Sequence, residues 1–264
     1  MAILETWSLT RRFGELVAVD SLTVAVQPGE VFALVGPNGA GKTTVIKMLV
    51  TLLLPSSGTA RVAGYDIVRQ APQVRRVIGY VPQALSADAT LTGYENLLIF
   101  AKLYDIPRAE RAERIRAALE LMGLADAANK LVRTYSGGMI RRLEIAQSML
   151  HRPPVLFLDE PTVGLDPVAR QSVWGRLEEM RRDYGTTIVL TTHYMEEADS
   201  LSTRVAIMHL GRVAAIGTPA QLKAEVGEGA TLDEVFVHFT GGELEGGGGY
   251  REAERTRRTS RRLG

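Results

Sequence analysis

A glycine-rich segment, GPNGAGKTT at residues 36–44, carries the residue types that hold phosphate groups in proteins. Gly36, Gly41, Lys42 and Thr43 match the pattern G-x-x-x-x-G-K-[ST]. Glycines at this spacing let backbone N–H groups converge on phosphate oxygens, while the lysine reaches the β and γ phosphates and the threonine hydroxyl ligates magnesium. The segment predicts a nucleotide site, with a structural glycine turn as the alternative. The predicted phosphate contacts are Gly36, Pro37, Asn38, Gly39, Ala40, Gly41, Lys42, Thr43 and Thr44.

Two successive carboxylates end a hydrophobic segment, LFLDEP at residues 156–161. Asp159 is placed to hold magnesium through water, and Glu160 is placed to polarise a water molecule in line with the γ phosphate. Without the glycine segment, the same residues would more often be an ordinary strand end and turn. Together with it, they predict hydrolysis of a nucleoside triphosphate.

Gln83 and His193 also follow apolar segments, VIGYVPQ and TTIVLTTH. Gln83 is predicted to contact both the metal and the attacking water, and His193 is predicted to hydrogen-bond the γ phosphate. A single glutamine or histidine is a weak signal, and a structural histidine is the alternative for His193. His151, His209 and His238 keep that structural interpretation.

A second glycine segment, TYSGGMIRR, lies at residues 134–142. Ser136, Gly137 and Gly138 precede the amphipathic segment MIRRLEIAQSML, so Ser136 is a candidate helix cap and the N–H groups form an anion site. A plain cap is the alternative. Because no strand brings this segment to the first glycine loop, its phosphate would belong to a second copy of the protein.

The elements that position these residues alternate between strands and helices. Residues 3–26 alternate in polarity around Gly14, which predicts a small antiparallel sheet. The segment VFALV at 31–35 is apolar on both faces, as a buried parallel strand is, and it leads into the glycine loop and a helix. This order is typical of a βαβ unit.

A mostly helical region at residues 92–150 interrupts this alternation, with Ile115, Leu119 and Met122 at helical spacing. The strand that precedes it is predicted at 77–83. The elements predicted after it are a strand at 155–160, a helix at 167–183, a strand at 186–193, a short helix and a hairpin around Gly211. The helical region is therefore an insertion into one α/β core.

The composition excludes several classes of protein. The 264 residues include no cysteine, which excludes disulfides and thiolate zinc sites, and the formal charge of +1 gives no bulk attraction to nucleic acid. The first residues contain no secretory signal, and no apolar segment approaches the roughly 20 residues of a membrane-spanning helix. Residues 251–264 contain six arginines and two glutamates, which predicts a flexible tail.

The segments GPNGAGKTT, YVPQ, YSGGM, VLFLDEPTVGLDP and TTH, in this order, resemble the nucleotide-binding subunit of ATP-binding cassette transporters over about residues 1–240. The resemblance implies an α/β fold, a P-loop NTPase core with a mixed sheet and an N-terminal antiparallel β subdomain. The helical subdomain is expected at about 84–150, and a Gly/Arg-rich tail at 241–264.

The resemblance also implies a head-to-tail homodimer that holds two ATP molecules, with Mg²⁺, at its interface. Each ATP would contact the phosphate loop of one subunit and the Ser-Gly-Gly of the other. Phe13 resembles the aromatic residue that stacks on adenine, and Asp166 the aspartate that contacts the opposite subunit. Gln83 resembles the glutamine that contacts the metal and the membrane partner, and His193 the switch histidine.

Within that family, TYSGGMIRRLEIAQSMLHRP together with TLDEVFVHFTGG at 231–242 is similar to daunorubicin/doxorubicin-resistance ATPases. Tyr135 and Met139 fit that group, whereas Ile140 stands where related exporters often have a basic residue. The similarity implies a separate membrane permease of the ABC-2 type and a location on the cytoplasmic face of the cell membrane. Drug, lipid, polysaccharide and peptide all stay open as the exported molecule, with a hydrophobic small molecule favoured.

Three functions are compatible with these observations. The first is an ATPase that powers export, by phosphoryl transfer to water, through the separate permease. The alternative is a soluble mechanical ATPase acting on DNA or ribosomes, but the chain has neither a long coiled coil nor a second cassette. A nucleotide-gated binding protein without turnover is the third, and the presence of Glu160 and His193 opposes it.

Overall fold

A six-stranded mixed sheet forms the centre of the protein, whose computed structural model describes residues 1–241. The strand order is β11-β10-β4-β9-β8-β7, in which β11 is antiparallel to β10 and the other neighbours are parallel. Every residue of β4, β8 and β9 is buried, as expected for strands covered on both faces. The strands are β4 (Val31–Val35), β7 (Ile78–Val81), β8 (Val155–Asp159), β9 (Thr187–Thr192), β10 (Arg204–His209) and β11 (Arg212–Gly217).

The carboxyl ends of four parallel strands meet at one edge of this sheet. Gly36 follows β4 and Glu160 follows β8, while His193 follows β9 and Gln83 comes two residues after β7. Loops at the carboxyl edge of a parallel sheet are where such folds bind ligands. The topology therefore brings together predicted site residues that lie far apart in the chain.

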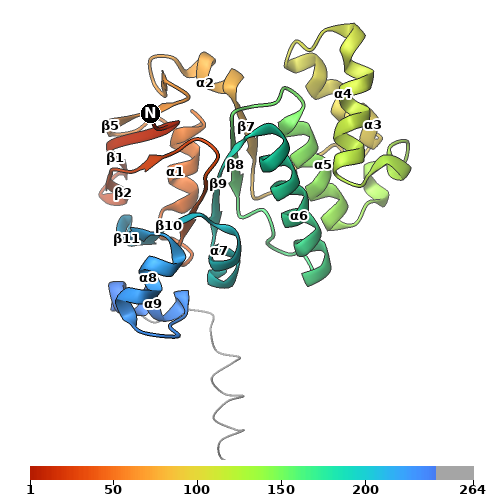
Figure 1. Ribbon diagram of the computed structural model, residues 1–264. Helices are drawn as coiled ribbons and strands as arrows, with labels where there is room; N and C mark the ends of the chain where they lie inside the picture. The colour runs from red at the N-terminus through yellow and green to blue at the C-terminus, as the bar shows by residue number, and fades with distance from the viewer. Residues whose placement is uncertain (242–264) are drawn as a thin grey trace, which may run out of the picture.

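A second, antiparallel sheet lies beside the first (Figure 1). Gly14, with φ of 58°, turns β1 into β2, as the sequence predicts. Two of its strands, β5 and β6, come from beyond the first helix and were missed by the sequence interpretation. The strands are β1 (Leu4–Phe13), β2 (Leu16–Leu22), β3 (Ala25–Val26), β5 (Ser57–Val62) and β6 (Tyr65–Asp66).

The two faces of the central sheet belong to different hydrophobic cores. Phe32 and Leu34 pack with helix α1 (Lys42–Leu49) and the antiparallel sheet. Ala33 and Val35, on the opposite face of β4, pack with residues of the helices on the other side. The alternation of side chains along a strand thus fixes which residues face α1.

Helices α3 and α4 stand apart from the antiparallel sheet, and α5 lies between them and the central sheet (Figure 1). The predicted core residues Ile115, Leu119 and Met122 are all buried. Within residues 1–241, no helix has the length and apolarity needed to cross a membrane. The remaining helices are α2 (Ala71–Val77), α3 (Gly93–Leu103), α4 (Arg108–Leu121), α5 (Gly137–Met149), α6 (Pro167–Tyr184), α7 (Met195–Leu201), α8 (Pro219–Val226) and α9 (Leu232–Thr240).

Two local expectations need correction. The strand predicted at 77–83 is shorter, because Val77 ends α2 and the extended pairing with β8 stops at Val81. Gln83 therefore lies in a loop rather than at the end of a strand. Helix α5 is buried on most of its surface rather than on one face, since α3, α6 and β7 all pack against it. The predicted tail lies, from residue 242 onwards, outside the described residues.

Candidate nucleotide site

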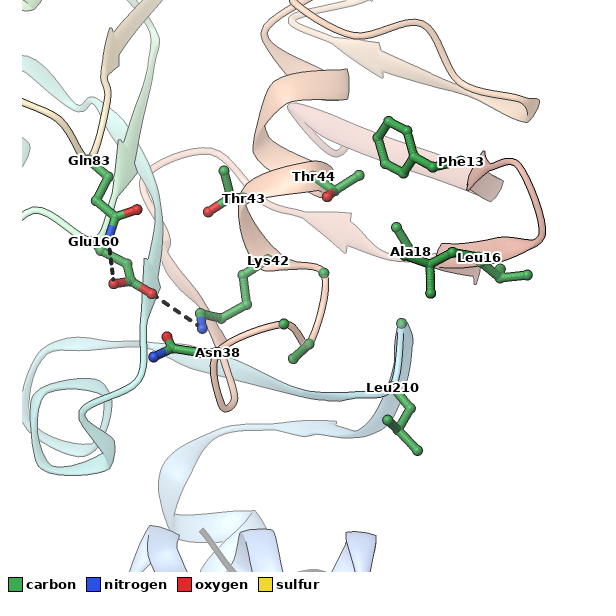
Figure 2. Close-up of a pocket in the computed structure, with 15 residues that line it drawn as sticks. Phe13, Leu16, Ala18, Asn38, Lys42, Thr43, Thr44, Gln83, Glu160 and Leu210 are labelled. Carbon is green, nitrogen blue, oxygen red and sulfur yellow. Dashed lines mark hydrogen bonds and ion pairs between the residues drawn. The ribbon is translucent and has the colours of Figure 1, made fainter. Parts of the chain in front are cut away.

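A cavity of about 630 Å³ opens where the glycine loop meets the carboxyl edge of the central sheet (Figure 2). Phe13 lies at one end, the carboxylate of Glu160 lies at the other, and Lys42 and Thr43 lie between them. The lining residues are Phe13, Leu16, Val17, Ala18, Asn38, Gly39, Ala40, Gly41, Lys42, Thr43, Thr44, Gln83, Glu160, Leu210 and Gly211.

Two glycines let the loop at residues 36–44 approach its neighbours closely. A Cβ atom on Gly36 would lie 2.2 Å from the carbonyl oxygen of Met208, and one on Gly41 would lie 2.4 Å from that of Ala18. Gly41 also has a φ of 102°, which side-chain-bearing residues rarely adopt. Helix α1 begins directly after it without a side-chain cap, so its first N–H groups can meet an anion.

Lys42 is almost completely buried at the centre of the cavity, with 4% of its surface exposed. Its ammonium donates hydrogen bonds to the carbonyl oxygens of Gly36, at 2.8 Å, and Pro37, at 3.1 Å. Nζ also lies 3.3 Å from Oε1 of Glu160. Burial lowers the pKa of Lys42, and the negative charge of Glu160 opposes that effect.

The Glu160 carboxylate brings three predicted site residues together. Besides Lys42, Gln83 donates a hydrogen bond from Nε2 to Oε2 at 3.3 Å, and Nδ1 of His193 lies 3.3 Å from the same oxygen. Glu160 has a φ of +48°, in the left-handed region that non-glycine residues rarely occupy. Such backbone strain, of about 1–3 kcal/mol, is concentrated at functional sites.

Asp159 is buried directly before Glu160, at the end of β8. Its Oδ1 accepts hydrogen bonds from the hydroxyls of Thr43, at 3.0 Å, and Thr191, at 2.7 Å. Carboxylate and hydroxyl oxygens are the ligands that Mg²⁺ prefers, so this donor set fits that metal.

Thr191 is a site residue that the sequence interpretation missed. Its hydroxyl donates a hydrogen bond to Asp159, and its Oγ1 accepts a second one from the backbone N–H of Glu160 at 2.9 Å. The signal was present as the two threonines before His193 in TTIVLTTH, because a hydroxyl buried there needs a partner.

The opposite end of the cavity is apolar. Phe13 is half exposed beneath the guanidinium of Arg11, which lies 4.5 Å from the ring centre. Leu16, Ala18 and Leu210 line the cavity on the same side (Figure 2). These three residues were not predicted, because Leu16 and Ala18 on β2 and Leu210 in the β10–β11 turn belong to no local motif.

The second glycine segment, with residues 136–138, lies outside this cavity. Ser136 caps α5 by accepting a hydrogen bond from the N–H of Met139 at 3.3 Å, and Asp166 caps α6 in the same way through Ala169 at 2.9 Å. A Cβ atom on Gly138 would lie 2.8 Å from the Cβ of Ala169, so the two helix starts lie side by side. Within the described chain, neither residues 136–138 nor Asp166 line the cavity.

Residues 19–163 match the family described as ABC transporter. The chain belongs to the ABC transporter family. It is 46% identical over 224 residues to the daunorubicin/doxorubicin resistance ATP-binding protein DrrA of Streptomyces peucetius, covering 85% of this chain and 68% of that protein. It is 43% identical to the Nod factor export ATP-binding protein I of Cupriavidus metallidurans, covering 92% and 78% of the two chains.

The fold agrees with this membership. A solved structure of the ATP-binding subunit of an ABC transporter superimposes with a TM-score of 0.81 at 32% identity, covering 90% of this chain and 99% of that one. The predicted P-loop NTPase fold and the predicted ATPase class are therefore confirmed. The names of these relatives refer to drug resistance and Nod factor export, which decides against the alternative of a mechanical ATPase acting on DNA or ribosomes.

Proposed function

We propose that two copies of this chain enclose two ATP molecules and use their hydrolysis to drive export of a hydrophobic small molecule through a separate permease. The observation that carries the proposal is the separation of Ser136 and Asp166 from the cavity that holds Lys42. Two anion-binding loops that do not meet within one chain can share a nucleotide when two copies pair head to tail.

At each shared site, the triphosphate would lie at the N-terminus of α1, with Lys42 on its β and γ phosphates and Phe13 against adenine. The partner copy would supply Ser136, Gly137 and Gly138, with Asp166 beside them. Thr43 and Gln83 would hold magnesium directly and Asp159 through water, and the metal would neutralise charge on the phosphates.

The hydrolytic step then depends on Glu160. A bound γ phosphate gives Lys42 a stronger partner, which frees Oε1 of Glu160 to take the proton from an attacking water. Gln83 and His193, both 3.3 Å from the other carboxylate oxygen, orient Glu160 and lie where the attacked phosphate would be held. His193 would then hydrogen-bond that phosphate.

The export assignment rests on the relatives, whose names refer to daunorubicin resistance and Nod factor export. The permease would be of the ABC-2 type, and the chain would sit on the cytoplasmic face of the membrane. The formal charge of +1 supports no role with nucleic acid.

Drug retention in the source cells tests this proposal. Cells whose own copy is deleted receive the wild type, Glu160→Gln, or Glu196→Gln, which changes an exposed glutamate of α7 as the matched control. We expect daunorubicin to be retained with Glu160→Gln as in the deletion strain, and exported with the other two. Equal retention in every strain would contradict drug export.

A further inference from the structure

Helix α5 carries a buried ion pair outside the nucleotide cavity. Nη1 of Arg141 lies 2.9 Å from Oε2 of Glu144, and the two side chains are only 3% and 2% exposed. Taking two charges out of water is costly, and apolar side chains of similar size often serve a core equally well. The contacts of this pair therefore indicate what it does.

Arg141 holds the backbone of the loop that carries Gln83. Its Nη1 donates to the carbonyl oxygen of Pro82 at 2.7 Å, and its Nη2 donates to that of Gln83 at 2.7 Å. The planar guanidinium fixes both carbonyls at once, which a single ammonium cannot do in the same geometry. The Gln83 side chain leaves this fixed backbone to reach Glu160.

Glu144 holds the same loop a few residues further on. Its Oε1 accepts hydrogen bonds from the backbone N–H and the hydroxyl of Ser86 and from the N–H of Ala87. Arg141 therefore holds the start of the loop and Glu144 its later part, and the ion pair joins the two attachments. Such charge-assisted hydrogen bonds are stronger than neutral ones.

Helix α5 begins at the second glycine segment, capped by Ser136. Arg141 lies about one and a half turns, and Glu144 about two turns, further along the same helix. We infer that Arg141 and Glu144 are positioning residues that make the Gln83 loop and the Ser136 end of α5 move as one body. This inference rests on the roles proposed for Gln83 and Ser136.

The consequence is communication between the two sites of a dimer. Gln83 belongs to the site of its own chain, whereas Ser136 would face the nucleotide bound by the partner copy. A displacement of Gln83 on nucleotide binding is passed through Arg141 and Glu144 to the helix that carries Ser136. Nucleotide at one site then changes the geometry of the other, which makes ATP hydrolysis cooperative.

The test compares Arg141→Gln with Arg142→Gln in the full chain. Arg142 is the neighbouring arginine of α5, but it donates to the carbonyl oxygen of Met122, at 2.8 Å, rather than to the Gln83 loop. We expect Arg141→Gln to lower kcat about tenfold or more, because a small misplacement of a site residue has that effect. Its Kd for ATP should stay within about twofold, since the phosphate loop is untouched. Arg142→Gln should keep wild-type kcat and a Hill coefficient above one.

A second variant separates positioning from folding. Arg141→Gln leaves Glu144 buried without its partner, so we also replace both residues, as Arg141→Met with Glu144→Leu. Replacing both members of a buried ion pair with apolar residues of similar volume often leaves stability unchanged or raises it. We expect this double variant to unfold at the wild-type temperature, yet to show the lowered kcat, a Hill coefficient of one and faster hydrogen exchange at the amides of Ser86 and Ala87.

A stable double variant with wild-type kcat, Hill coefficient and amide exchange overturns the inference, as does an Arg141→Gln chain that matches Arg142→Gln. Amide exchange is measured without ATP, so it tests the attachment of the loop separately from catalysis. A wild-type chain that hydrolyses no ATP would refute the proposed function, while exchange at Ser86 and Ala87 would still decide whether Glu144 holds the loop.

Discussion

Lys42 and Glu160 form an ion pair across the nucleotide cavity, with Nζ 3.3 Å from Oε1. In the proposed mechanism both groups must leave this ion pair. The Lys42 ammonium is needed on the phosphates, and the Glu160 carboxylate is needed on the attacking water. Because both side chains are nearly fully buried, water screens little of the charge of either group. In the proposed mechanism, binding of phosphate to Lys42 would therefore also release Glu160 for catalysis.

Replacing Glu160 with glutamine separates binding from turnover. A glutamine keeps the shape of the side chain but cannot accept the proton of water, so we expect phosphate release to fall about a hundredfold or more. ATP binding, measured by calorimetry, should persist because Lys42 and the loop are unchanged. Glu196→Gln, which changes an exposed side chain of α7, should hydrolyse ATP at the wild-type rate. Wild-type turnover in Glu160→Gln would remove this carboxylate from the role of general base.

Phe13→Ala should weaken ATP binding without slowing the chemical step. Stacking of a base on an aromatic ring contributes about 1–3 kcal/mol, so we expect KM for ATP to rise about tenfold with kcat nearly unchanged. Trp7→Ala is the matched control, since Trp7 is an exposed aromatic residue of the same strand that does not line the cavity. A KM that rises equally in both variants would count against adenine stacking.

His151 should make stability depend on pH. It stacks on Tyr104 at 3.7 Å and its Nε2 bonds the carbonyl oxygen of Ile78 at 3.0 Å, and burial lowers the pKa of His151 to about 4. Because the folded pKa lies below the unfolded value, this contribution is complete above about pH 6.5 and is lost as pH falls towards 4.

We therefore expect the free energy of unfolding to fall by about 2 kcal/mol more in the wild type than in His151→Gln between about pH 7 and pH 4.5. Glutamine still offers an N–H to Ile78 but does not titrate. Urea unfolding at the two pH values measures the difference. Parallel curves for the two chains would show that His151 is not held neutral by the fold.

Much of the phosphate side of the site was predictable from the sequence, because its chemistry lies in short motifs. Lys42, Thr43, Asp159 and Glu160 each sit in a segment whose pattern specifies both a strand and the loop after it. Parallel pairing then brings these strand ends together without further information. The interpretation of β4 as a buried parallel strand is confirmed for the same reason.

The residues that the sequence did not reveal act through long-range contacts. Leu16 and Leu210 meet at the apolar end of the cavity only because β2 and the β10–β11 turn come together. The segment MIRRLEIAQSML was interpreted as amphipathic, but tertiary packing buries its charged residues Arg141 and Glu144 against the Gln83 loop. No local pattern distinguishes such buried charges from surface charges.

Mixing two inactive chains tests whether the sites are shared. Lys42→Ala removes the phosphate lysine and Ser136→Arg blocks the opposing cap, so a mixed dimer retains one intact site. We expect a 1:1 mixture to recover about a quarter of wild-type activity at most, since about half of the dimers are mixed and each has one of two sites.

The matched control mixes Lys42→Ala with Glu160→Gln. Both changes affect the site of their own chain, so each mixed dimer has two damaged sites and activity should not recover. Equal activity in the two mixtures would contradict a site built from opposing chains.

The most direct measurement is the mass in solution of Glu160→Gln with and without ATP, by light scattering. If nucleotide is enclosed between two copies, the mass should rise from that of one 28.8 kDa chain to about twice that value when ATP is added. Glu160→Gln combined with Ser136→Arg should stay at the mass of one chain. A Glu160→Gln chain that binds ATP but keeps the mass of a single copy at saturating nucleotide would contradict a nucleotide shared between two copies.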